Sequence, residues 1–124
     1  MSENIKITLM VISGTAIILL SSLAFADGNV KRGQALFNDP NLSGSSFGVS
    51  CNTCHPRGKG LEKSGADEKK KWSSCAGEQK SLEDAINTCI LTANKGRSLA
   101  VESQEMKDLI AYIKSLTKRN LKAH

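Results

Sequence analysis

Five consecutive residues carry the most chemistry in this sequence: Cys51-Asn52-Thr53-Cys54-His55. Two cysteines separated by two residues, followed at once by histidine, form the attachment signature of c-type haem. Each thiol adds across one vinyl group of the porphyrin, so both sulfur atoms must reach the same edge of one ring. The next residue can then place its imidazole under the iron. The pattern predicts one covalent haem c per chain, held by Cys51, Cys54 and His55.

Two other kinds of site also use closely spaced cysteines. A zinc site would need two further ligands, which Cys75 and Cys89 could supply. A thioredoxin-like redox pair needs two cysteines and gives no role to the histidine. An export signal would favour haem over both, because the machinery that attaches c-type haem works outside the cytoplasmic membrane.

The N-terminal residues carry such a signal. Lys6 supplies a positive charge, residues 7–20 are almost entirely apolar, and Ala24-Phe25-Ala26 offers a small-x-small cleavage site. We therefore expect a signal peptide over residues 1–26 and a mature domain over residues 27–124, exported to the periplasm or an equivalent compartment. An uncleaved anchor is the alternative, although the apolar run is short for a membrane span.

The composition of residues 27–124 fits a domain built around a large apolar group. Besides histidine, its aromatic residues are Phe37, Phe47, Trp72 and Tyr112, which predicts a thin core that a porphyrin would fill. The net charge of +5 suggests attraction to an acidic partner surface, with an ordinary solvated basic surface as the alternative. No basic stripe interleaved with aromatic residues points to nucleic acid.

Three helices are expected to position the motif. The first is capped by Asp27 or Asn29 and runs to about Asn38, with Gly33 and Phe37 on one face. A glycine inside a helix costs about 1 kcal/mol relative to alanine, so Gly33 predicts the close approach of another helix. Residues 39–50 and 56–80 read as loops, the second with a short helical turn over residues 67–72 and with Trp72 packed against the haem edge or the core.

The second helix begins after the cap Ser81, with Asp84 placed for a capping box, and ends at residues 94–96. Its spacing predicts an inward stripe that includes Cys89, together with Leu82, Ala85, Ile86 and Ile90. The last helix is expected over residues 103–117, with an apolar stripe of Met106, Leu109, Ile110, Ile113 and Leu116 and a frayed tail to His124.

The order of these features resembles class I cytochromes c: a first helix with Gly-x-x-x-Phe, the haem motif, and a last helix reading Asp108-Leu109-Ile110-Ala111-Tyr112-Ile113. The resemblance implies an all-α fold of three to four helices around one covalently attached haem. It also implies that the first and last helices cross, with Gly33 and Phe37 meeting Leu109 and Tyr112.

One feature of that family is missing. Common class I cytochromes place an axial methionine before the last helix, and residues 95–102 contain none. Residues 81–89 resemble instead the cytochrome domains of thiosulfate dehydrogenases and SoxA-type sulfur-oxidation cytochromes, in which a cysteine after Ile-Asn-x is the axial thiolate. The resemblance implies that Cys89 is the sixth iron ligand, although those sequences usually carry arginine at the place of Ala85 and have a second haem domain or a partner subunit.

Several alternatives for the sixth position stay open. Met106 lies on a core stripe, Lys95 lies in the preceding loop, Cys75 is a further thiol, and the site could be vacant. Exported cysteines usually pair, so a Cys75–Cys89 disulfide is also possible. If Cys89 binds iron, Cys75 is left as a free thiol or as a bridge to another subunit.

We expect an electron-transfer protein without substrate chemistry of its own, hence not an enzyme. An anionic ligand such as the Cys89 thiolate stabilises ferric iron, which predicts a low reduction potential. The first alternative is a haem protein that binds or senses NO or CO. The second is a subunit of a sulfur-compound-oxidising enzyme, with Lys95 and Arg97 in its pocket. The expected partners are a redox protein and a second small cytochrome, as in the His/Cys heterodimers of the NaxLS type.

Overall fold

The computed structural model describes residues 27–123, so the predicted signal peptide and His124 lie outside the described residues. Along the chain stand α1 (Val30–Asn38), α2 (Cys51–Cys54), β1 (Trp72–Ser74), β2 (Gly77–Gln79), α3 (Leu82–Cys89) and α4 (Gln104–Lys122). Short 3-10 turns cover Leu42–Gly44 and Pro56–Gly58, and a π-helical segment, Ile90–Asn94, extends α3. Among the helices of residues 27–123, none has both the length and the apolar character needed to cross a bilayer.

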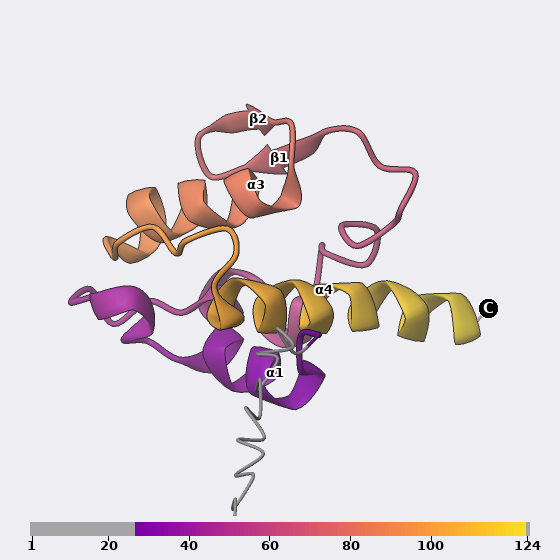
Figure 1. Cartoon of the computed structure of the whole chain (residues 1–124), viewed down its shortest axis with the longest axis horizontal. Helices are drawn as coiled ribbons and strands as arrows, with labels where there is room; N and C mark the ends of the chain where they lie inside the picture. The colour runs from indigo at the N-terminus through magenta and orange to yellow at the C-terminus, as the bar shows by residue number, and fades with distance from the viewer. Residues whose placement is uncertain (1–26, 124) are drawn as a thin grey trace, which may run out of the picture.

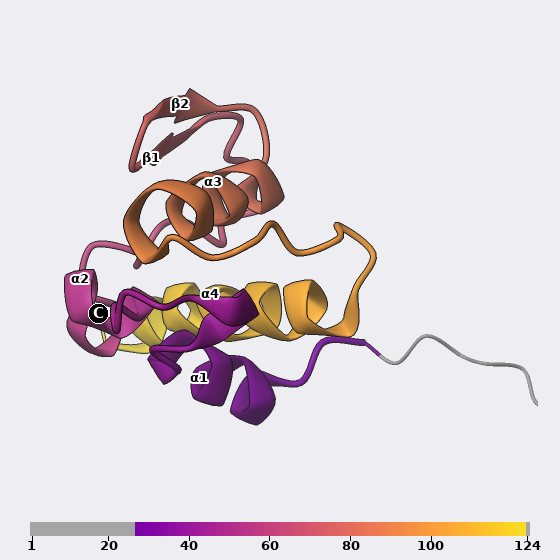
Figure 2. The same ribbon diagram turned by 90° about the vertical axis from the view of Figure 1, so that its left-hand side faces the viewer.

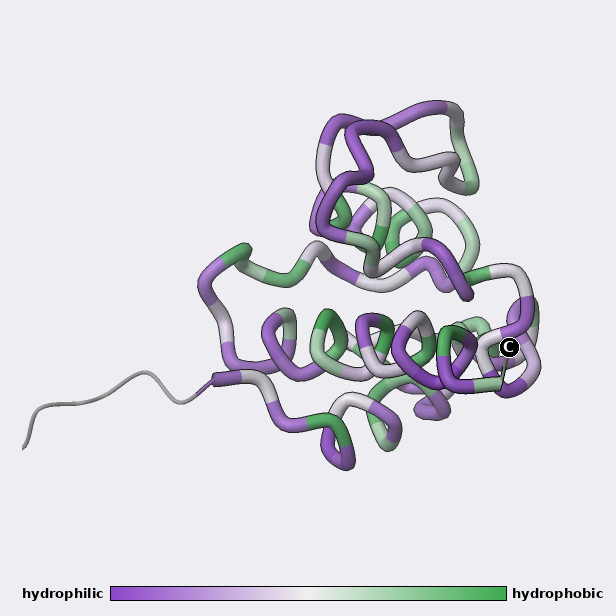
Figure 3. Tube along the Cα trace, turned by 90° about the vertical axis from the view of Figure 1, so that its right-hand side faces the viewer, coloured by the Kyte–Doolittle hydropathy of each residue, from purple (hydrophilic) through white to green (hydrophobic). Residues whose placement is uncertain are grey.

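The elements form two layers (Figures 1 and 2). Helices α1 and α4 cross in one layer, while α3 and the β1–β2 hairpin form the other. The 19-residue α4 is the longest element of residues 27–123 and carries much of the core on one face. Hydrophobic and hydrophilic segments alternate along it with the helical period (Figure 3). Its buried stripe contains Met106, Leu109, Tyr112, Ile113 and Leu116.

The contact between α1 and α4 follows the predicted pattern. Gly33 is buried, and a Cβ at this position would overlap the backbone carbonyl of Asp108 and lie 2.9 Å from the Cβ of Tyr112. The rings of Phe37 and Tyr112 lie 5.0 Å apart, centroid to centroid, at an interplanar angle of 59°. Tilted pairs at this distance are favourable. The expectation that Gly33 permits a close helix crossing is confirmed.

Capping confirms the starts of the three longer helices. Asn29 accepts the backbone N–H of Arg32 at 2.9 Å, which makes Asn29 the cap of α1 and leaves Asp27 without that role. Ser81 accepts the backbone N–H of Asp84 at 3.0 Å. Ser103 accepts that of Met106 at 3.2 Å. Lys95 is the C-cap of the π-helical segment and has a left-handed backbone conformation, with φ of 57°.

Three expectations need correction. The fold is not purely α-helical, because residues 72–79 form an antiparallel hairpin in which Trp72 pairs with Gln79 and Ser74 with Gly77. The helix predicted over residues 67–72 does not form: residues 67–68 lie in a single turn in which the Lys69 backbone N–H donates to the Ala66 carbonyl at 3.2 Å, and Trp72 begins β1. Gly77 takes a φ of 101°, which glycine adopts without steric cost. The last helix also ends later than predicted, at Lys122, since residues 118–122 are mostly good helix formers.

Candidate cofactor site

A cavity of about 470 Å³ lies between the two layers. This volume falls in the range usual for cofactor sites, about 300–1,000 Å³. Its walls come from all four α-helices and from β1 and are largely apolar, with Phe37 from α1, Leu109 and Ile113 from α4, and Leu82, Ala85 and Ile86 from α3. The inward stripe of α3 thus faces a cavity as well as its neighbours. An apolar guest would complete the core at this place.

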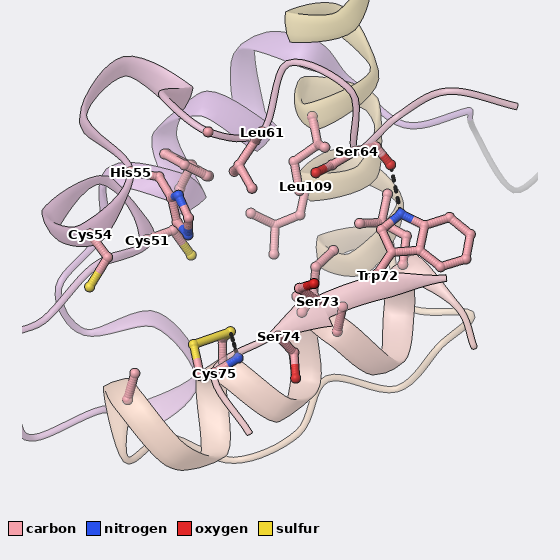
Figure 4. Close-up of a pocket in the computed structure, with 18 of the residues that line it drawn as sticks. Cys51, Cys54, His55, Leu61, Ser64, Trp72, Ser73, Ser74, Cys75 and Leu109 are labelled. Carbon is pink, nitrogen blue, oxygen red and sulfur yellow. Dashed lines mark hydrogen bonds between the residues drawn. A yellow bond between two sulfur atoms is a disulfide. The ribbon is translucent and has the colours of Figure 1, made fainter. Parts of the chain in front are cut away.

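The cysteine motif forms one end of the cavity. Ser50 caps the four-residue α2 by accepting the backbone N–H of Thr53, and the Thr53 hydroxyl accepts the backbone N–H of Ser50 in return. Both cysteines line the cavity, with Cys51 half-buried and Cys54 exposed at its edge (Figure 4). Burial raises the pKa of the Cys51 thiol to about 11. Before attachment, this thiol is therefore protonated at neutral pH.

The imidazole of His55 also lines the cavity, and a hydrogen bond to the backbone fixes its orientation. The His55 Nδ1–H donates a hydrogen bond to the Lys59 carbonyl at 3.0 Å, which leaves Nε2 available as a metal ligand. The chain reaches Lys59 through a tight turn in which Arg57 has φ of 56° and Gly58 has φ of 82°. The turn is also held by the Arg57 backbone N–H, which donates to Asn52 at 2.8 Å.

The hairpin and the end of α3 form the wall that faces His55 (Figure 4). Cys75, in the turn of the hairpin, is joined by a disulfide to Cys89 of α3, with a Cα–Cα distance of 5.1 Å. Both residues line the cavity. The backbone N–H of Cys75 also lies 3.2 Å from the Cys89 sulfur. The structure thus brings Cys89 to the cavity as expected, but pairs it with Cys75 through the disulfide considered in the sequence.

The other candidates for the sixth iron ligand, Met106 and Lys95, lie outside the cavity lining. Met106 is fully buried in the hydrophobic core and does not line the cavity. Lys95 is exposed and lies outside the lining as well. The zinc alternative lacks its ligands, because Cys75 and Cys89 are bonded to each other. Among residues 27–123, no group of three or more His, Cys, Asp and Glu side chains is arranged to hold a metal ion.

Sequence reasoning anticipated Trp72 at the site but missed other parts of it. Trp72 was expected against the haem edge or the core, and it lines the cavity while its Nε1–H donates to the Ser64 carbonyl at 2.8 Å. Its neighbours Ser73 and Ser74 were not expected there. The Ser50–Thr53 capping box was also missed, although its Ser-x-x-Thr spacing is visible in the sequence.

Asn87 fixes the segment that follows α3. Its side-chain amide donates to the Leu99 carbonyl at 2.9 Å and accepts the Leu99 backbone N–H at 2.8 Å. Nearby, the Asn94 side chain donates to the carbonyl of Val49 at 2.6 Å, next to the haem motif. These side-chain contacts hold the cavity wall to the segments on either side of it.

These residues fit a c-type haem: two thiols and an imidazole share one end of an apolar cavity, and Nδ1 of the imidazole is already hydrogen-bonded, which leaves Nε2 for the iron. The family described as SoxA/TsdA, cytochrome c domain, matches residues 32–120. The chain is a member of this family. Neither the curated proteins nor the solved structures gave a match to this chain.

Membership establishes the cofactor and the general role of this SoxA/TsdA-type domain. A cytochrome c domain carries covalently bound haem c, and its role is haem-based electron transfer. Domains of this kind are typically extracytoplasmic. The predicted resemblance to SoxA and thiosulfate dehydrogenase domains is confirmed.

Proposed function

We propose that this chain is an exported monohaem cytochrome that transfers single electrons and performs no substrate chemistry of its own. The observation that carries the proposal is the convergence of Cys51, Cys54 and His55 on one apolar cavity. In this arrangement the two sulfur atoms would anchor the porphyrin edge, and His55 Nε2 would bind the iron. The apolar side chains of α3 and α4 exclude water from the cavity. Fewer solvent molecules then have to reorient when the haem gains or loses an electron.

For the sixth iron ligand we propose the thiolate of Cys89. Its support is position, because the Cys75–Cys89 disulfide lies on the wall that faces His55 (Figure 4), whereas Met106 is enclosed in the core. An anionic sulfur next to the iron disfavours the added electron, so the reduction potential is expected well below that of a His/Met cytochrome. This ligation requires the Cys75–Cys89 disulfide to be open.

A potentiometric titration of the haem-loaded protein tests this assignment. The expected result for protein with free thiols is one reversible one-electron wave at low potential, which shifts upward in Cys89→Ser. The matched control is Ser98→Ala, an exposed position outside the cavity lining. A high potential that Cys89→Ser leaves unchanged would rule out the thiolate.

A second candidate function is the binding of NO or CO. The disulfide favours it, since a closed Cys75–Cys89 bond leaves no thiolate to face His55. The ferrous iron would then offer its sixth position to a small gas. A CO difference spectrum of the ferrous, disulfide-closed protein tests this idea, and an unchanged Soret band would exclude it.

A third candidate is a subunit of an enzyme that oxidises thiosulfate or a related compound, assembled with another cytochrome. Its support is membership of the SoxA/TsdA family and the net charge of +5. Arg97 and Lys95 do not line the cavity, so they would act only at its approaches. Mixing the ferric protein with thiosulfate, alone and with a candidate partner, would show haem reduction only if this function is correct.

A further inference from the structure

The Cys75–Cys89 disulfide joins two differently exposed residues. Cys75 lies in the exposed turn between β1 and β2. Cys89 is half-buried at the end of α3, and the disulfide faces the cavity that also contains His55 (Figure 4). A dissolved thiol can therefore approach Cys75 from solvent, whereas Cys89 is shielded by the cavity wall. Accessibility decides which sulfur of a disulfide is attacked.

We propose that Cys75 is a redox control residue for the iron's sixth position. The closed disulfide withholds the Cys89 sulfur from the iron, and an external dithiol of the thioredoxin class releases it. This inference rests on the proposed Cys89 ligation and adds to it the condition under which that ligand is available. The protein would then have two forms, one with a vacant sixth position and one with His/Cys ligation.

The exchange is balanced in electrons and atoms. A thiolate of the dithiol attacks the Cys75 sulfur, the Cys75–Cys89 bond breaks, and its electron pair leaves on Cys89 as a thiolate. The second thiol of the dithiol then attacks the mixed disulfide and frees Cys75, which takes up a proton. The dithiol ends as a disulfide, having supplied two electrons, and the iron does not change its oxidation state. A disulfide of the same class reverses the reaction.

The leaving sulfur is held where it is needed. The Cys75 backbone N–H, 3.2 Å from the Cys89 sulfur, can donate to the thiolate as it forms. Because this donor belongs to the backbone, it is retained when the side chain of Cys75 is replaced. The Cys89 thiolate is then released at the place of the disulfide, on the cavity wall that faces His55.

The hairpin has contacts that do not depend on the disulfide. Its strands pair between Trp72 and Gln79, and the Ser74 hydroxyl donates to the Gly77 carbonyl at 2.7 Å. Trp72 is tied to Ser64 through its indole N–H at 2.8 Å. Opening the sulfur–sulfur bond therefore leaves the hairpin in place, and the two side chains need only rotate apart.

The test uses the haem-loaded protein in its ferric state, before and after treatment with dithiothreitol that is then removed under argon. Alkylation followed by mass spectrometry counts the free thiols, and EPR reports the iron ligands. We expect the closed form to have no free thiol and no thiolate signal. The opened form should show two thiols, Cys75 and Cys89, when it is alkylated after unfolding. Its EPR spectrum should show a narrow low-spin rhombic signal, which is the thiolate signal.

Two variants separate gating from ligation. Cys75→Ser should give the thiolate signal without any dithiol, because it cannot form the disulfide. Cys75→Ser/Cys89→Ser also leaves the hairpin without a disulfide, but it has no sulfur at position 89 to bind the iron. It should therefore never give this signal. Absence of the signal in Cys75→Ser would overturn the Cys89 ligation itself. A wild-type protein whose thiolate signal persists under disulfide-forming oxidation would overturn the gating and leave the ligation intact.

Discussion

The Asp108 carboxylate of α4 accepts the Nε–H of Arg32 in α1 at 2.7 Å, although the Asp108 side chain is only 3% exposed. The same carboxylate accepts the backbone N–H of Asn29 at 2.6 Å and the side chain of Gln104 at 2.9 Å. The hydrogen bond from Arg32 is the main cause that lowers the pKa of Asp108 to about 2. This carboxylate thus joins the start of α1 to α4, beside the crossing at Gly33.

The first prediction concerns the pH dependence of stability. The pKa of Asp108 is about 2 in the folded chain and about 3.9 in an unfolded one. Between these values the unfolded state binds more protons, so the free energy of unfolding falls as pH falls from about 5 to about 2. Asp108→Asn should lower this free energy by about 2 kcal/mol at pH 7 and flatten its acid dependence.

Urea denaturation at a series of pH values measures this effect. The matched control is Asp67→Asn, because the Asp67 side chain is 94% exposed and its ion pair with Lys114 is long, at 3.6 Å. The control should change stability by less than about 0.5 kcal/mol. Equal losses in the two variants would contradict the special role of Asp108.

The second prediction is that Gly33→Ala destabilises the protein. In an open helix this change would stabilise by about 1 kcal/mol. Here the added methyl would overlap the carbonyl of Asp108 and force α1 away from α4. We expect a net loss of about 1–3 kcal/mol in the free energy of unfolding. Gln34→Ala, at the exposed neighbouring position, is the control and should be close to neutral.

The third prediction concerns haem attachment. Cys51→Ser/Cys54→Ser removes both sulfur atoms that reach the porphyrin, so we expect no haem that survives a denaturing gel. Cys75→Ser, which also removes one cavity-lining sulfur atom, should retain covalent haem in full. Peroxidase staining of the gel and the mass of the intact chain provide the measurement. A covalent haem on the double variant would show that another residue carries it.

The fourth prediction concerns the stabilising effect of the disulfide. The bond closes a loop with a sequence separation of 14 residues. A loop of this length lowers the entropy of the unfolded chain enough to stabilise the fold by about 3 kcal/mol. Cys75→Ser/Cys89→Ser should lose about this amount relative to the closed wild-type protein. This variant avoids the complication of an iron–sulfur bond.

Thermal or urea denaturation of the haem-loaded proteins measures this loss. Glu78→Gln, at an exposed position of the same hairpin outside the cavity lining, serves as the control and should change stability by less than about 0.5 kcal/mol. A double variant as stable as the closed wild-type protein would show that the disulfide adds nothing to the fold.

The sequence by itself determined the features that depend on short-range spacing. Cys51, Cys54 and His55 lie within five residues, so one turn of chain brings them together. The Gly33–Phe37 pair and the apolar stripe of α4 follow from the helical period, which is why the crossing could be predicted. The cap at Ser81 could be predicted because it depends on a contact with Asp84, only three residues further along the chain.

Only the tertiary structure decided the wall opposite His55. The hairpin over residues 72–79 has no clear alternating pattern, and its strands are only three residues each, so packing against α3 selects it over a loop. The same packing brings Cys75 next to Cys89, two thiols whose partners the sequence left open. Such contacts depend on which distant segments share the cavity, and no local pattern records that arrangement.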